Sequence, residues 1–514
     1  MDKKHRVLIA ALALPLVAVS TTSPSFAQTA EAVTKAAIAR VRATDPKIHA
    51  VIALDPTALD QARAIDGRKG AHGLLYGYAI LIKDNIESDG PLPTTAGSMA
   101  LLANVPHRDA PLVARLRAAG AVILGKTNLS EWANIRSNAS ISGWSAVGGQ
   151  TRNPFALDRD PCGSSSGSGA AVAAGEVEAA IGTETDGSIT CPAAINGVVG
   201  LKPTVGLVSR SRIVPISHSQ DTAGPIAADV TTAARILAAI AGSDPADPAT
   251  KDADAHISDY LAGLKAGSLS GVRIGVLRFA TGWSAGTDKV FEKALGVLRA
   301  QGAVLVDITE MKDREKLGDA ETLVLNTELK VDLNAYLATT PAAVQSRTLA
   351  DLIAFNTAHA DRELTLFGQE TFVKAEATKG LEDPAYKAAR AASLRIARAD
   401  GIDAMLAKDH LDVLVSPTMP PAWMIDAVNG DQIAGAGAGG LAAIAGYPHL
   451  TVPMGAVLGL PVGLSFIGPA WSEARLLSYG YGYEQASRAK ITPRFLPSVE
   501  AEAPVAPLLE PMQR

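Results

Sequence analysis

The chain has 514 residues, a net charge of −5 and a hydrophobic content of 47%. A chain of this length and composition forms a globular protein with a substantial core. Its charge is mildly acidic and shows no basic stripe, so nucleic acid is not an expected partner. The two cysteines and nine histidines show no metal-ligand spacing, and we therefore expect no metal and no cofactor.

The first 27 residues have the pattern of a secretory signal peptide. Lys3 and Arg6 lie in a basic start, residues 7–19 are apolar, and Ser25 and Ala27 are the small residues that a cleavage site requires. An uncleaved membrane anchor is the alternative, but the apolar run is short for a bilayer. We expect cleavage after Ala27, a periplasmic or secreted mature protein, and no stable membrane association after cleavage.

The first part of the mature chain alternates between helical patterns and apolar runs. Residues 30–66 predict two helices, of which the first ends at Asp45-Pro46 and the second has Pro56 in its first turn. The next elements are a strand, a helix and a second strand, expected at 78–82, 110–118 and 121–125. This alternation is typical of an α/β fold and disfavours an all-α protein or a β-sandwich.

The second half of the chain continues this alternation around one long helical stretch. The expected elements are helices at 230–241 and 290–299, and strands at 272–277, 303–306, 413–418, 450–453 and 463–468. Residues 312–408 are charged, rich in alanine and helical, and we interpret them as an insertion. Because no repeat or linker divides the chain, we expect residues 28–514 to form one large domain.

Two clusters of glycine and small polar residues lie within residues 160–203. Residues 163–167 and 185–188 bracket an Ala/Val helix and a short apolar run. Clusters of this kind leave backbone N–H groups free to bind a negatively charged oxygen. Ser188, in the second cluster, is therefore a candidate nucleophile beside a candidate oxyanion hole.

A serine nucleophile needs a base, and Lys83 is the candidate. It follows the apolar strand at 78–82, so its amine is expected to be poorly solvated, and burial lowers the pKa of a lysine by up to about 3–5 units. No histidine lies near Ser188 in the sequence. Taken singly, the serine also fits an ordinary turn, and the lysine fits a solvent-facing side chain.

Taken together, these stretches resemble the amidase signature family over nearly the whole mature chain. The matching motifs are, in order, LIKDN at 81–85, GKTNLSE at 125–131, GGQTRNP at 148–154, GSSSGSG at 163–169, DGSI at 186–189, GLKPT at 200–204, AGYP at 445–448, VP at 452–453 and LPVG at 460–463. The resemblance implies a single α/β/α domain in which helices cover a central mixed β-sheet.

The resemblance also implies a Ser–cis-Ser–Lys triad. Ser188 would be the nucleophile, Ser164 the bridging serine after a cis peptide bond, and Lys83 the base. Ser164 would pass the Ser188 proton to Lys83 and return it to the leaving amine, so that an acyl-enzyme forms on Ser188 and is then hydrolysed. The remaining residues assigned to oxyanion and substrate binding are Thr185, Asp186, Gly187 and Ser165.

The match has two departures near Ser188. Asp186 and Thr190 stand where the family usually has glycine and arginine, and an acidic Asp186 would disfavour anionic substrates or bind an amide N–H. Residues 184–200 are most similar to bacterial peptide amidases, which release ammonia from C-terminal peptide amides. The resemblance thus implies a secreted, cofactor-free amidase for a peptide or small-molecule amide, and we expect it to be a monomer.

Several alternatives stay open beside this hypothesis. The chain would also fit an amidase for small aliphatic or aryl amides, or a non-catalytic amide-binding protein on the same fold. The signal peptide argues against a subunit of a cytoplasmic transamidating assembly. Ser165 fits the GxSxG pattern of α/β-hydrolases, but the polar residues before it predict no strand. Cys162 and Cys191 flank the two serine clusters, either as a disulfide or as two buried free thiols.

Overall fold

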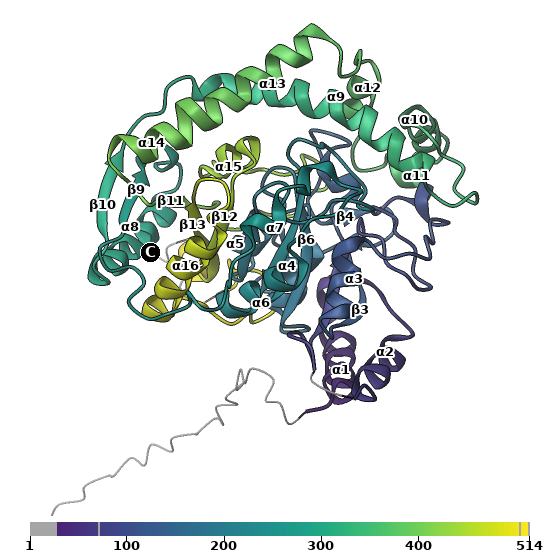
Figure 1. The fold of residues 1–514 in the computed structure, drawn as a ribbon, viewed down its shortest axis with the longest axis horizontal. Helices are drawn as coiled ribbons and strands as arrows, with labels where there is room; N and C mark the ends of the chain where they lie inside the picture. The colour runs from purple at the N-terminus through teal and green to yellow at the C-terminus, as the bar shows by residue number, and fades with distance from the viewer. Residues whose placement is uncertain (1–27, 70–71, 503–504, 512–514) are drawn as a thin grey trace, which may run out of the picture.

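The computed structural model describes residues 28–69, 72–502 and 505–511, which form an eleven-stranded mixed β-sheet covered by helices on both faces (Figure 1). The architecture confirms the predicted α/β fold. The predicted signal peptide lies outside the described residues. Within the described ranges, no helix is long and apolar enough to cross a membrane.

The strands of the large sheet follow the order β1-β3-β2-β6-β8-β7-β12-β13-β11-β9-β10. Their bounds are β1 Val51–Leu54, β2 Ala79–Lys83, β3 Val122–Thr127, β6 Ala179–Glu184, β7 Val199–Lys202, β8 Thr222–Ala227, β9 Arg273–Leu277, β10 Val304–Ile308, β11 Val413–Pro417, β12 His449–Val457 and β13 Leu460–Ile467. A separate ribbon pairs β4 (Trp144–Ser145) with β5 (Gly149–Gln150).

The α-helices cover both faces of the sheet and one of its edges. Their bounds are α1 Ala30–Ile48, α2 Ala58–Asp66, α3 Pro111–Ala118, α4 Ser166–Ala173, α5 Thr190–Ile195, α6 Val230–Ile240, α7 Ala253–His256, α8 Ala285–Ala300, α9 Leu317–Ala338, α10 Leu349–Ala358, α11 Ala360–Glu363, α12 Glu370–Glu376, α13 Pro384–Ala397, α14 Asp403–Lys408, α15 Gly439–Ala445, α16 Glu473–Ser487 and α17 Ala506–Leu509.

Strand direction explains which residues meet at the edge of the sheet. β2 runs parallel to both β3 and β6, so the carboxyl ends of these three strands lie at the same edge. β8, β7, β12 and β13 then continue the sheet in antiparallel pairs. As a result, Lys83 at the end of β2 lies near Glu184 at the end of β6.

Strand β2 is buried on both faces, as its continuous apolar sequence predicts. Ile80 and Ile82 point to one face and pack in the core that includes residues of α3 and α6. Leu81 points to the opposite face and packs against residues of α1 and α4. This burial fixes the direction in which the following Lys83 leaves the strand.

The long helices α9 and α13 lie side by side and arch over one edge of the sheet (Figure 1). On α9, Leu329, Leu333 and Tyr336 pack in an apolar cluster that also contains Trp132 and Val214. Residues 312–408 are therefore largely helical, as predicted. Their packing brings one side of α9 close to the carboxyl edge of β2 and β6.

Two predicted boundaries in the first part of the chain were wrong, and one strand was missed. Helix α1 continues through Pro46 to Ile48. The missing proline N–H interrupts only the last turn, because the helix ends at His49, which is left-handed and donates its N–H to the Asp45 carbonyl at 2.8 Å. Pro56 precedes α2 and is not in its first turn. The short strand β1 lies between these helices and was not predicted.

Candidate active site

Lys83 and Ser164 form the best-defined contact of the site. The Lys83 amine is fully buried and donates to Ser164 Oγ at 2.7 Å and to Thr183 Oγ1 at 2.9 Å. Burial lowers the pKa of Lys83 to about 7, although the carboxylates of Asp221 and Glu184 act in the opposite direction. A large fraction of this lysine is therefore neutral near neutral pH and able to accept a proton.

Ser164 follows a cis peptide bond from Gly163, as the family resemblance implies. Position 163 has no room for a side chain, because a Cβ there would lie 2.1 Å from Ser130 Oγ. The Ser164 carbonyl in turn accepts a hydrogen bond of 3.1 Å from Ser130 N–H. These contacts pack the segment tightly and direct the Ser164 hydroxyl toward Lys83.

Ser188 lies in the turn between β6 and α5. Gly187 has a φ of +79° there, which favours glycine, and Ser188 is 8% exposed. The Ser188 carbonyl accepts a hydrogen bond of 3.1 Å from Ser165 N–H, so the two serine clusters are in contact. Within the described residues, no hydrogen bond joins the Ser188 hydroxyl to Ser164 or to any other group. This hydroxyl is available to a substrate.

The backbone around Ser188 offers N–H donors for an oxyanion. In the described part of the chain, the N–H groups of residues 185–188 have no acceptor. By contrast, Glu184 Oε2 accepts from Ile189 N–H at 2.7 Å and from Thr190 N–H at 2.9 Å. Glu184 thus satisfies the first donors of α5 and leaves the preceding ones for a ligand.

Asp186, one of the two departures from the family pattern, is exposed beside the start of α15. A Cβ placed on Gly440 would lie 3.3 Å from Asp186 Oδ2. Desolvation by the surrounding protein, together with the carboxylates of Glu321 and Glu184, raises the pKa of Asp186 well above its ordinary value. Because the residue is exposed, solvent screens part of this effect.

Ser165 links the two serine clusters through its side chain. Its hydroxyl donates to the Thr183 carbonyl at 3.1 Å and accepts from Thr183 N–H at 3.2 Å, and the residue is fully buried. Both hydrogen bonds hold β6 against the first cluster. A hydroxyl that is engaged in this way is poorly placed to attack a substrate, which further disfavours the GxSxG alternative.

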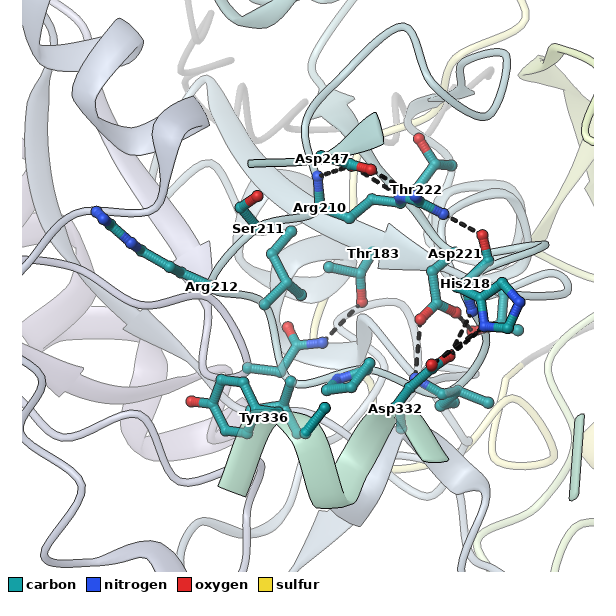
Figure 2. Close-up of a pocket in the computed structure, with 18 of the residues that line it drawn as sticks. Thr183, Arg210, Ser211, Arg212, His218, Asp221, Thr222, Asp247, Asp332 and Tyr336 are labelled. Atoms are coloured by element: carbon teal, nitrogen blue, oxygen red, sulfur yellow. Dashed lines mark hydrogen bonds and ion pairs between the residues drawn. The ribbon is translucent and has the colours of Figure 1, made fainter. Parts of the chain in front are cut away.

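A cavity of about 500 Å³ opens beside these residues (Figure 2). Thr183, Thr185 and Asn85 line it on the side of β6 and β2, and residues 213–216 and Tyr336 form apolar parts of its wall. The charged residues of its wall are Arg108, Arg210, Arg212, His218, Asp221, Asp247 and Asp332. Its volume is within the usual range for a site that binds a small organic molecule or a short peptide.

Thr183 and Asp221 belong to the site but were not predicted as functional residues. Thr183 Oγ1 accepts from Lys83 and, at 3.0 Å, from Asn85 Nδ2. Asp221 Oδ1 accepts from Thr185 Oγ1 at 2.6 Å. A polar residue near the end of β6 could have suggested Thr183, but nothing local in the sequence separates Asp221 from other loop aspartates.

His218, Glu328 and Asp332 have potential ligand atoms within 4.8 Å of one another. His218 Nδ1 lies 2.9 Å from Asp332 Oδ2, and its Nε2 lies 3.5 Å from Glu328 Oε1. The hydrogen bond to Asp332 raises the pKa of His218. Because a carboxylate lies at each ring nitrogen, the protonated ring forms an ion pair with both acidic residues.

Removal of divalent metal ions is therefore expected to leave the activity unchanged. The groups proposed to react are the Ser188 and Ser164 hydroxyls and the Lys83 amine, and the protonated His218 ring already offsets part of the negative charge of the three-residue cluster. The measurement is kcat/KM on an amide substrate before and after dialysis against a chelator. A loss of activity that zinc restores would contradict this prediction.

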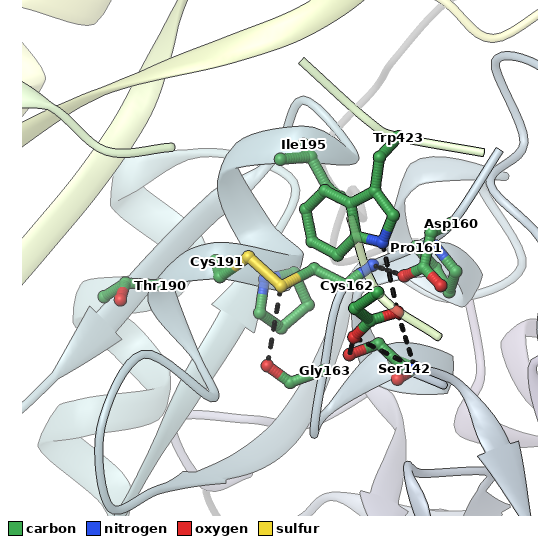
Figure 3. Close-up of a disulfide and its surroundings, with 12 residues drawn as sticks. Ser142, Asp160, Pro161, Cys162, Gly163, Thr190, Cys191, Ile195 and Trp423 are labelled. Carbon is green, nitrogen blue, oxygen red and sulfur yellow. Dashed lines mark hydrogen bonds between the residues drawn. A yellow bond between two sulfur atoms is a disulfide. The ribbon is translucent and has the colours of Figure 1, made fainter. Parts of the chain in front are cut away.

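The Cys162–Cys191 disulfide resolves the alternative that the sequence left open (Figure 3). The two Cα atoms are 6.0 Å apart, and the bridge packs against Ile195 and Trp423. Cys162 lies two residues before Ser164, and Cys191 lies three residues after Ser188. The bridge thus joins the segments that carry the two serines.

Thiol titration of the unfolded, unreduced protein is expected to find no free cysteine, because both cysteines of the chain are in this bridge. After reduction, the same assay should find two. The protein should be purified without reductant, and a Cys162→Ser, Cys191→Ser double variant provides the blank. Two reactive thiols before reduction would contradict the disulfide.

Comparison with known proteins shows that the chain is similar to amidases over most of its length. A family model described as Amidase matches residues 32–477. Native peptide amidase from Stenotrophomonas maltophilia has a solved structure that is 52% identical, with a TM-score of 0.85 over 91% of this chain and 96% of that one. The peptide amidase PAM in complex with the competitive inhibitor chymostatin is also 52% identical, with a TM-score of 0.87 over the same shares. A probable amidase of Arabidopsis thaliana is 38% identical over 467 residues, 88% of this chain and 86% of the plant protein.

Proposed function

Since this chain belongs to the amidase signature family, we propose that it hydrolyses the C-terminal carboxamides of peptides to free acids and ammonia. The proposed substrate class rests on the 52% identity to peptide amidase over 91% of the chain. The cavity beside Thr185 supports it, because its size suits a short peptide.

In the proposed first step, neutral Lys83 takes the Ser188 proton through the hydroxyl of Ser164. Ser188 Oγ then attacks the carboxamide carbon, and the N–H groups of residues 185–188 bind the negative oxygen that forms. One such donor is worth about 2.7–4 kcal/mol of transition-state stabilisation in other enzymes. The C–N bond breaks as Ser164 returns the proton to the nitrogen, which leaves as ammonia.

In the second step, water attacks the acyl group on Ser188 and passes one proton to Lys83 through Ser164. The ester bond breaks, Ser188 recovers its proton, and the peptide leaves with a free carboxyl group. Each turnover therefore consumes one water and releases one ammonia. The Lys83–Ser164 hydrogen bond supports this relay, and the substrate would bring Ser188 into line with it.

The test is mass spectrometry of a C-terminally amidated tripeptide with an internal asparagine, after incubation with the mature protein. Conversion of the terminal amide alone, with the side-chain amide intact, is the expected result. Conversion of only small aliphatic or aryl amides would replace the peptide substrate with the second candidate class. Binding of amides without any turnover would point to the non-catalytic alternative.

We propose further that the mature protein is periplasmic or secreted, on the strength of its first 27 residues. Expression of the full chain in a bacterial host, followed by fractionation and N-terminal sequencing, tests this. Gln28 at the N-terminus of extracytoplasmic protein is the expected result. Intact protein that stays in the membrane fraction would contradict it.

A further inference from the structure

Residues 217–221 form a loop between two parts of the molecule that are distant in sequence. The loop leads into β8, next to β6 in the sheet. On one side it contacts helix α9, and on the other it contacts Thr185 at the end of β6. Figure 2 shows His218 and Asp221 of this loop together with Asp332 of α9.

The contacts with α9 use three carboxylates on one side of the helix. Glu321, Glu328 and Asp332 are seven and four residues apart, so they share a face. The hydrogen bonds are Gln220 Nε2 to Glu321 Oε1 at 2.7 Å, Ser219 Oγ to Glu328 Oε2 at 2.8 Å, Ser217 Oγ to the same Glu328 oxygen, and His218 N–H to Asp332 Oδ2 at 2.7 Å.

Glu328 is the buried centre of this contact. It is fully buried, and Tyr386 of α13 donates to its Oε1 at 2.7 Å. Glu328 does not line the cavity. A change at this residue therefore reaches the cavity and Ser188 only through the groups that it holds.

The contacts with Thr185 hold that residue at two atoms. Asp221 Oδ1 accepts from the Thr185 hydroxyl at 2.6 Å, and Gln220 Nε2 donates to the Thr185 carbonyl at 3.3 Å. The loop itself is held in shape, because Asp221 Oδ2 accepts from Ile216 N–H at 2.8 Å and from Ser217 N–H at 2.9 Å. The side-chain amide of Gln220 thus bonds to Thr185 and to α9 at the same time.

We propose that the loop 217–221 is a positioning element. It connects helix α9 to the backbone at residues 185–188 and thereby fixes the position of the N–H groups that bind the oxyanion. Glu328 and Gln220 are its two main positioning residues. The inference rests on the proposed function, since it concerns the donors that stabilise the transition state. Donors of this kind act only when they lie at hydrogen-bond distance from the developing oxyanion, and a displacement of about 1 Å can cost about 100-fold in rate.

Two isosteric variants test the two ends of the loop. Glu328→Gln replaces an acceptor for Ser217 and Ser219 by an amide. Gln220→Glu places a carboxylate against Glu321 and against the Thr185 carbonyl, and it supplies a second test if Glu328→Gln does not fold. The matched control is Asp319→Asn, which makes the same kind of change at an exposed position of α9, where the side chain has no hydrogen bond to any described residue.

We expect both variants to lower kcat on the amidated tripeptide by about 10- to 100-fold and to change KM by less than about threefold, with wild-type values for Asp319→Asn. Hydrogen–deuterium exchange should show faster uptake in a peptide that covers residues 183–190, a readout that needs no substrate. Wild-type kcat and uptake in the folded variants would overturn the inference, as would a rise in KM with kcat unchanged. If the wild-type protein hydrolyses no amide, the proposed function fails, and the exchange result alone decides whether the loop positions residues 183–190.

Discussion

Replacement of Ser188 by alanine is expected to lower kcat for a peptide amide by about 10⁴- to 10⁶-fold, the range seen when a serine nucleophile is removed elsewhere. The substitution removes the attacking oxygen but leaves the N–H donors of residues 186–188 and the cavity in place. KM or the binding constant should therefore change little. The measurements are steady-state kinetics and calorimetric titration of the variant with the amidated tripeptide.

The same variant is expected to fold normally. Within the described residues the Ser188 hydroxyl has no hydrogen-bond partner, so its removal leaves no buried group unpaired. The free energy of unfolding should change by no more than about 0.5 kcal/mol. Ser165→Ala is the control, because it removes two hydrogen bonds to Thr183 and should lose about 1–2 kcal/mol of stability. Full activity of Ser188→Ala, with none in Ser165→Ala, would contradict the assignment of the nucleophile.

The parts of the site that the sequence predicts are those that depend on local pattern. A short uninterrupted apolar run favours a strand buried on both faces, and Lys83 comes directly at the end of that strand. Ser188 lies in a cluster whose glycine marks a tight turn, and the resemblance to the amidase signature family then adds Ser164 and pairs both serines with the lysine. None of these inferences needs a contact between residues far apart in the chain.

The residues that the sequence did not predict depend on tertiary contacts. Asp221 is one of many loop aspartates until β8 pairs with β6 and brings it to Thr185. Glu328 belongs to a charged helix, and no local pattern indicates that α13 and residues 217–219 bury it. The disulfide was left open for the same reason, since the 6.0 Å between its Cα atoms results from the packing of the two serine segments.

Replacement of Lys83 by methionine is expected to lower kcat/KM by about 10³-fold or more, and to remove the dependence of activity on pH in the acid range. Burial lowers the pKa of Lys83 from 10.5 to about 7. Below that pH the amine is protonated and cannot accept the Ser188 proton, so wild-type kcat/KM should fall about tenfold per pH unit. Above about pH 7 it should reach a plateau. The measurement is the pH profile of kcat/KM for both proteins.

Lys126 provides the matched control for this prediction, because it is also a buried lysine and lies near the end of the adjacent strand β3. Its amine lies 4.0 Å from Asp84 Oδ1 and donates to Thr94 Oγ1 at 3.0 Å, with no serine in reach of it among the described residues. Lys126→Met should therefore lower the free energy of unfolding, since it leaves the buried Asp84 carboxyl without its cation. The folded fraction of Lys126→Met should keep the wild-type fall in kcat/KM below about pH 7. If instead Lys126→Met removed this fall and Lys83→Met retained it, the base would be Lys126, and the relay through Ser164 would be wrong.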